Sequence, residues 1–88
     1  LVIHLIDSRR DATRHDQAIM QYLKGGPVPY LIILSKADKL SKNKQQASQK
    51  KLNKLLAEMY LEVPVIVASA KSKKGRDEIW RWIQDVVR

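Results

Sequence analysis

The sequence predicts an α/β fold with a parallel sheet, in which three strands and three helices alternate as βαβαβα. Three apolar runs without polar alternation lie at residues 1–6, 28–34 and 63–68. Such runs are typical of strands that are covered on both faces. Each run is followed by a segment with apolar residues at helical spacing. This regular alternation favours helices that cross over between parallel strands.

The elements follow from local signals in order along the chain. Asp7 ends the first run, Gly25 ends the first helix, and the break Gly25-Gly26-Pro27 precedes the second run. The third run surrounds Pro64, and the last helix begins near Gly75. The expected buried stripes of the three helices are, in order, Ala18, Ile19, Tyr22 and Leu23; Leu52, Leu55, Leu56 and Met59; and Ile79, Trp82, Ile83 and Val86.

Composition limits the possible functions. The 88 residues include 17 Lys and Arg but only 9 Asp and Glu, a net charge of +8, and this length allows one small domain. The absence of cysteine excludes a disulfide framework and a cysteine nucleophile. No apolar run is long enough for a membrane span, and no His or carboxylate cluster has metal-ligand spacing. The positive charge favours an acidic partner, with nucleic acid or the ribosome first.

Two features predict that the unit is part of a larger domain. The sequence begins directly in a strand of the buried type. A parallel sheet of three strands with bare apolar edges is also a poor free-standing fold. The alternative is a compact miniature domain or a dimer that pairs with itself through the open sheet edge.

Polar residues follow each of the three strands, where ligands of open parallel sheets bind. The three segments are Asp7-Ser8-Arg9-Arg10, Ser35-Lys36-Ala37-Asp38 and Ser69-Ala70-Lys71. A carboxylate at Asp38 offers two coplanar acceptor oxygens, which match the N1–H and N2–H₂ donors of guanine. The aliphatic stem of Lys36 can cover a base, and the backbone N–H of Ala70 can donate to the guanine O6.

These segments resemble known motifs. Ser35-Lys36-Ala37-Asp38 is similar to the Asn/Thr-Lys-x-Asp motif of GTP-binding proteins, and Ser69-Ala70-Lys71 is similar to their second base-contacting motif. Together with Leu5-Ile6-Asp7-Ser8-Arg9-Arg10, Asp16 and the segment from Lys73 to Trp80, they resemble the bacterial EngB (YihA) family of ribosome-biogenesis GTP-binding proteins. The resemblance covers essentially all 88 residues. Ser35 departs from the Thr that is usual in that family.

The resemblance implies a three-layer fold like that of P-loop NTPases, with residues 1–88 as the C-terminal half of one GTP-binding domain. It implies binding of GTP or GDP, a role in assembly of the large ribosomal subunit, a requirement for normal cell division, and a cytoplasmic location. The base-binding residues would be Ser35, Lys36, Ala37, Asp38, Ala68, Ser69 and Ala70.

The phosphate site has no counterpart in these residues. The sequence contains no Gly-x-x-x-x-Gly-Lys-Ser/Thr motif, and its three glycines cannot form one. In the family this loop and the Asp-x-x-Gly motif precede the strand that corresponds to residues 1–6. We therefore expect Mg²⁺ and catalysis to belong to an absent N-terminal half, and the 88 residues alone not to hydrolyse GTP.

Simpler interpretations accompany these assignments. Asp38 could cap a following helix, and Ser69-Ala70 could be only a tight exit from a strand. Ten of the 17 basic residues lie within residues 39–57 and 71–76, where a solvated helix surface is the simple explanation and contact with rRNA the functional one. The candidate RNA-contacting residues are Lys42, Lys44, Lys50, Lys51, Lys73 and Lys74.

Two other functions remain open at this point. One is a circularly permuted ribosome-assembly GTPase, in which the phosphate loop would follow these residues. The other is a basic miniature domain that binds RNA and never binds nucleotide. Only the second of these alternatives predicts RNA binding without any response to GDP.

Overall fold

The computed structural model describes residues 1–87, in which three strands alternate with three α-helices as expected. The elements are β1 (Val2–Asp7), α1 (Arg14–Leu23), β2 (Tyr30–Ser35), the short 3-10 helix η1 (Ala37–Lys39), α2 (Lys42–Glu58), β3 (Val65–Val67) and α3 (Arg76–Val87). The two later strands are shorter than the apolar runs that predicted them. Each of the helices is too short or too polar to cross a lipid bilayer.

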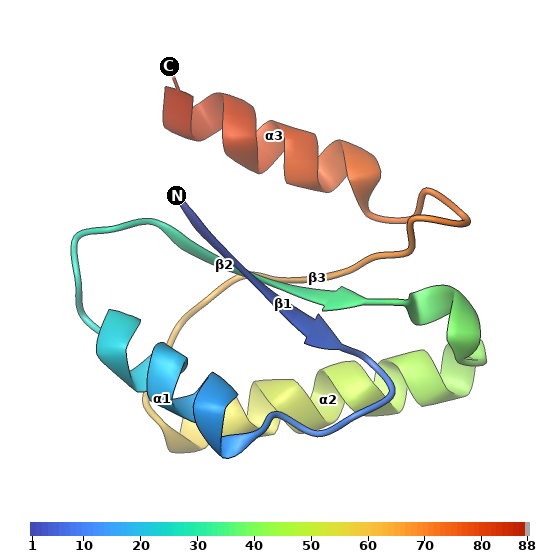
Figure 1. The fold of residues 1–88 in the computed structure, drawn as a ribbon, viewed down its shortest axis with the longest axis horizontal. Coiled ribbons are helices and arrows are strands. Elements are labelled where there is room, and N and C mark those ends of the chain that lie inside the picture. Colours follow the sequence, from blue (N-terminus) through green and yellow to red (C-terminus); the bar gives the residue numbers. More distant parts are fainter. Residues whose placement is uncertain (88) are drawn as a thin grey trace.

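The three strands are parallel and lie in the order β1-β2-β3, so β2 is the central strand. Their register pairs Asp7 with Ser35 and Leu34 with Val67. The carboxyl ends of the strands therefore meet at one edge of the sheet, at the right-hand side of Figure 1. This is the edge at which the sequence places the candidate binding residues.

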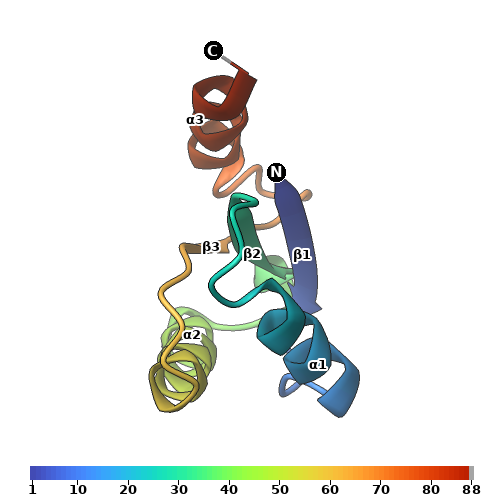
Figure 2. The same cartoon turned by 90° about the vertical axis from the view of Figure 1, so that its left-hand side faces the viewer.

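Helices cover both faces of the sheet, so the fold has three layers. Helices α1 and α2 lie on one face, and α3 lies on the other (Figure 2). The core under α1 and α2 consists of Ile6, Met20, Ile32, Leu34, Leu52, Leu56 and Leu61. The core under α3 consists of Leu31, Ile33, Ile66 and Ala68, against which Ile79 and Trp82 pack. Strand β2 supplies residues to both cores, which explains its uninterrupted apolar sequence.

Helix α1 is rotated from the expected orientation. Its expected stripe is wrong at Ala18 and Tyr22, because both are exposed, and Met20 is the fully buried residue instead. The cause is Asp16, which closes a capping box with Thr13 and accepts a hydrogen bond from His4 of β1. Asp16 and Met20 are four residues apart and share one helical face, so the polar contact turns Met20 toward the sheet.

The stripes of the other two helices are largely confirmed. Leu52 and Leu56 are buried, and Leu55 and Met59 pack against the same core. In α3, Ile79 and Trp82 pack on the sheet, whereas Val86 is exposed.

Strand β1 is covered on one face only, contrary to the expectation for its apolar run. His4 and Ile6 are buried on the side of α1. Ile3 and Leu5 point to the other side and are 40% and 65% exposed. The reason is that α3 packs over residues of β2 and β3, so it leaves the neighbouring strip of β1 open.

Candidate functional site

The loop that follows β2 is tied to both neighbouring strands. The Ser35 hydroxyl donates to the carbonyl of Ile6 across a distance of 3.3 Å. The backbone N–H of Ala37 donates to the carbonyl of Ala68 at 3.1 Å, and Ala37 is fully buried. Lys36, between these two anchors, has φ +59° in the left-handed region, a conformation that costs energy for a residue with a Cβ. Its side chain projects into solvent from a fixed backbone position.

Asp38 and Ser69 join the loops after β2 and β3. The Ser69 hydroxyl donates to Asp38 Oδ1 at 2.7 Å and accepts from the backbone N–H of Ser72 at 3.1 Å. Ser69 is 3% exposed, whereas Asp38 is exposed. The hydrogen bond from Ser69 is the main cause that lowers the pKa of Asp38. A buried hydroxyl therefore holds a solvent-facing carboxylate in its ionised form.

This geometry contradicts the simpler interpretation of Asp38. Asp38 lies in η1, and the residue that caps α2 is Ser41, whose side chain accepts from the backbone N–H of Lys44 at 3.3 Å. Ser69 is also more than a strand exit, because it bonds to a residue 31 positions away. The last expected residue of the site, Ala70, follows Ser69 and is exposed at the same edge.

Asp7, at the end of β1, organises a cluster of charge beside these loops. Its Oδ1 accepts from the backbone N–H of Arg9 at 2.9 Å and from Arg9 Nε at 3.1 Å, and its Oδ2 accepts from Arg9 Nη2 at 2.8 Å. Lys36 Nζ lies 3.8 Å from the same Oδ2. The side-chain hydrogen bond from Arg9 is the main cause that lowers the pKa of Asp7 well below its usual range.

That Asp7 binds Arg9 and lies beside Lys36 was not predicted from the sequence. The available signal was the Asp-x-Arg spacing directly after a strand, because an Asp commonly accepts hydrogen bonds from the residue two positions later. The contact with Lys36 had no signal in the sequence, since the two residues come from different strands.

The candidate RNA-contacting lysines lie on α2 and on the loop before α3. Two of the six already have partners, since Lys51 Nζ lies 2.7 Å from Asp11 Oδ1 and Lys74 Nζ donates to Gln45 Oε1 at 2.8 Å. All six side chains are exposed; the other four are Lys42, Lys44, Lys50 and Lys73. The basic residues thus occupy a solvated surface next to the strand-end loops.

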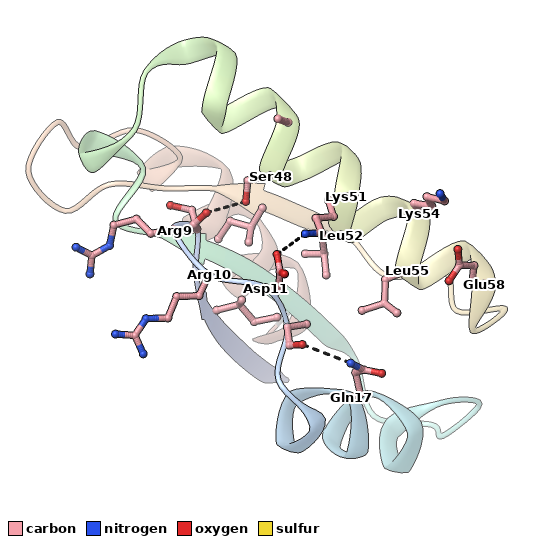
Figure 3. A pocket seen from close by; sticks show the side chains of 15 residues that line it. Arg9, Arg10, Asp11, Gln17, Ser48, Lys51, Leu52, Lys54, Leu55 and Glu58 are labelled. Carbon is pink, nitrogen blue, oxygen red and sulfur yellow. Dashed lines mark hydrogen bonds and ion pairs between the residues drawn. The ribbon is translucent and has the colours of Figure 1, made fainter.

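A cavity of about 550 Å³ lies between helix α2 and the segment after β1, which includes Ser8 and Arg9 (Figure 3). Its walls include Ile6, Leu34 and Leu52, and the ion pair between Asp11 and Lys51 crosses it. None of the expected base-binding residues lines it. The candidate site is therefore an open edge of the sheet and not this hollow.

The part of the chain that the structure describes contains no cluster of potential metal ligands. Residues 1–87 contain no group of three or more His, Asp or Glu side chains placed to hold a metal ion. The carboxylates at the strand ends are engaged with Ser69 and Arg9. The described residues at this end of the sheet therefore form no Mg²⁺ site of their own.

Comparison with solved structures defines the class of fold. The crystal structure of the bacterial selenocysteine-specific elongation factor EF-Sec superposes with a TM-score of 0.79 over 97% of this chain and 15% of that chain, at 15% sequence identity. The α/β fold with three parallel strands and three helices is confirmed.

Comparison with curated sequences identifies the relatives. "Probable GTP-binding protein EngB" of Pediococcus pentosaceus is 33% identical over 84 residues, which are 96% of this chain and 43% of that protein. The protein of the same name from Oenococcus oeni is 37% identical over 83 residues, or 94% and 42% of the two chains. The resemblance to EngB proteins is thus confirmed along nearly the whole chain, which spans about two fifths of the length of these relatives. No protein-family model matches the chain.

Proposed function

We propose that residues 1–88 are the C-terminal half of a single GTP-binding domain and that they recognise the guanine base of GTP or GDP. The observation that carries this proposal is the 2.7 Å hydrogen bond between Ser69 and Asp38, which joins the two loops expected to contact the base. The names of the EngB relatives support guanine nucleotide as the ligand.

Asp38 would read the base. Its exposed carboxylate is kept ionised by Ser69 and can accept from the N1–H and N2–H₂ groups of guanine. Adenine lacks this pair of donors, so the carboxylate would lose its partners with the wrong base. Lys36 would cover one face of the base with its aliphatic stem, and the backbone N–H of Ala70 would donate to O6.

The phosphates would be held by residues outside this chain. The three glycines of the sequence form no phosphate-binding loop, and no described residues are grouped as metal ligands. When bound, Mg²⁺ would supply charge neutralisation at the phosphates. The residues of this chain would orient the base, and the 88 residues alone would not hydrolyse GTP.

The open face of β1 supports the proposal of a half domain. Ile3 and Leu5 are exposed side by side on the strand face that α3 leaves uncovered, and Trp80 is 52% exposed on α3. Apolar groups in such a strip are usually buried against another element. The absent half would cover this strip; without it, self-association of the chain would do so.

Asp38→Asn in the intact gene product tests the base-reading role. The amide loses the charge and one of the two acceptor oxygens, so GDP binding is expected to weaken by about tenfold or more. Xanthosine diphosphate is expected to bind better, because the amide can donate to its O2. Asp77→Asn, in the exposed first turn of α3, is the matched control and leaves both affinities unchanged. Unchanged GDP affinity in Asp38→Asn contradicts the proposal.

We further propose that the intact protein acts in the cytoplasm in assembly of the large ribosomal subunit and is required in cell division, which is what the resemblance to the EngB family implies. The net charge of +8 and the exposed lysines of α2 support an RNA partner. Lys42→Ala with Lys44→Ala is expected to reduce the salt dependence of rRNA binding by about two counterions. Lys51→Ala, whose ammonium is paired with Asp11, is the control with the smaller effect. Equal effects contradict the assignment of this surface.

A further inference from the structure

Two neighbouring segments at the carboxyl ends of the strands carry four charged side chains, two of each sign. Asp7 and Arg9 come from the end of β1, and Lys36 and Asp38 come from the end of β2. The register that pairs Asp7 with Ser35 sets these two segments side by side. Lys36 Nζ lies 3.8 Å from Asp7 Oδ2, so the two segments are in contact through their side chains.

Arg9 is bound by Asp7 and not by Asp38. Three hydrogen bonds of 2.8–3.1 Å join the backbone N–H and guanidinium of Arg9 to the Asp7 carboxylate. Asp38 still acts on this side chain, because the pKa of Arg9 is raised first by its hydrogen bond with Asp7 and to a smaller degree by the charge of Asp38. The negative charge of Asp38 therefore also acts on the Arg9 guanidinium.

The guanidinium group of an arginine can compete with guanine for a carboxylate. Guanidinium presents two parallel N–H donors to the two oxygens of a carboxylate, and the N1–H and N2–H₂ edge of guanine does the same. If Arg9 bound Asp38 in this way, it would occupy the oxygens that the base needs. A free Arg9 would therefore close the base site by an intramolecular contact.

We propose that Asp7 is a positioning residue for base recognition, which binds the guanidinium of Arg9 in a fork and so keeps the Asp38 carboxylate open to guanine. This inference rests on the base-reading role proposed above. Asp7 also lies 3.8 Å from Lys36 Nζ, so the same carboxylate holds the ammonium beside the base site. Asp7 thereby engages Arg9 and Lys36, and neither of these two cations is bound to the Asp38 carboxylate.

A double-mutant cycle in the intact gene product tests the proposal, with GDP affinity as the readout. Asp7→Asn keeps an oxygen that can accept from the backbone N–H of Arg9 but loses the charge that binds the fork. We expect about tenfold weaker GDP binding, because Arg9 then pairs with Asp38. Arg9→Ala alone leaves affinity within about twofold, and Arg9→Ala added to Asp7→Asn restores most of the loss.

Arg10 provides the matched control for this cycle. It is the adjacent exposed arginine, and Figure 3 shows its side chain directed away from α2. Arg10→Ala in the Asp7→Asn background should give no recovery. If Arg10→Ala restores binding as well as Arg9→Ala does, a general gain from lost positive charge explains the result and the proposal is wrong. If Arg9→Ala alone weakens binding and gives no recovery in the double variant, Arg9 contacts the nucleotide and the proposal is also wrong.

Asp38→Asn, measured in the same series, distinguishes a failure of the base-reading role of Asp38 from a failure of the positioning role of Asp7. If it leaves GDP affinity unchanged, the base-reading role and the role of Asp7 both fail. If it weakens GDP binding while Asp7→Asn does not, only the role of Asp7 fails. If a variant does not fold, a measurement on the unaltered protein still tests the proposal. The ¹⁵N signal of Arg9 Nε–H should stay at the same position with and without GDP. A large shift on GDP binding overturns the proposal.

Discussion

Asp16 Oδ1 lies 2.8 Å from Nε2 of His4, so the first turn of α1 is bound to the interior of β1. An ionised carboxylate can only accept, so His4 donates through Nε2, and its Nδ1 is joined to the Tyr30 hydroxyl by a hydrogen bond of 2.6 Å. His4 is 7% exposed, and both of its ring nitrogens are satisfied, as expected for a histidine in an apolar strand. This chain of contacts connects α1, β1 and β2.

Acid should weaken the fold through Asp16. Burial alone raises the pKa of this carboxyl, but hydrogen bonds from Thr13 and His4 outweigh burial and lower it below the ordinary value of 3.8. A lowered pKa means that Asp16 stabilises the fold at neutral pH and that this contribution is lost as pH falls through the lowered value.

Asp16→Asn is therefore expected to reduce the free energy of unfolding at pH 7 by about 1–2 kcal/mol, through the weakened cap and the lost charged contact, and to flatten its acid dependence. Urea unfolding at pH 7, 4 and 2.5 measures both effects. Asp85→Asn on the exposed face of α3 serves as the control. A pH dependence that persists unchanged in Asp16→Asn would assign the acid sensitivity to other carboxyls.

Ser69→Ala should weaken nucleotide binding without unfolding the protein. The variant removes the hydroxyl that donates to Asp38, so the carboxylate loses its orientation and its pKa rises toward the ordinary value. We expect GDP affinity to fall about three- to tenfold at pH 7 and to begin its acid decline at a higher pH than in the unaltered protein. Calorimetric titration between pH 4 and 7 measures this, with Ser72→Ala as control, because Ser72 contributes only its backbone N–H to the loop.

Gly75→Ala should be strongly destabilising. Gly75 has φ +79°, and an added Cβ would lie 2.7 Å from the Val67 carbonyl oxygen and 3.0 Å from Ile66 Cγ2. We expect a loss of about 2–4 kcal/mol from backbone strain and overpacking together. Gly25→Ala is the matched control, because Gly25 has φ +70° and no atom within 4 Å of the added Cβ. It should cost about 1–2 kcal/mol. Equal losses in the two variants would mean that the close approach at Gly75 is unimportant.

The 88-residue chain should associate with itself through the open strip of β1. Ile3→Thr with Leu5→Thr keeps residues suited to a strand but removes the apolar surface. Sedimentation velocity at rising concentration is expected to show dimers or larger species for the unaltered chain and monomers for the double variant. Tyr60→Ser, which removes an 86% exposed aromatic side chain elsewhere, should leave association unchanged. A chain that remains monomeric throughout contradicts the prediction.

The features predicted correctly from the sequence depend on local patterns. The run from Leu31 to Leu34 had to be a strand buried on both faces, because all four residues are apolar and a central strand meets helices on both sides. Asp38 and Ser69 were placed at one edge by topology alone, since parallel strands align their carboxyl ends.

The features that escaped prediction depend on partners distant in sequence. The rotation of α1 follows from the bond between Asp16 and His4, which overrides the apolar stripe through Tyr22. The contact of Asp7 with Lys36 joins the residues at the ends of two different strands. Such contacts require the register of the sheet, which no periodicity in the sequence supplies.

The position of β1 at the end of the sheet has a consequence for how the sheet can grow. A strand at an edge presents a row of backbone N–H and C=O groups on its outer side, which is a template for one more strand. Val2–Asp7 carries neither the lysine nor the proline that commonly blocks strand addition, and its only charged residue, Asp7, lies at the end of the strand. The side of the sheet away from β3 is therefore competent to accept a further strand beside β1.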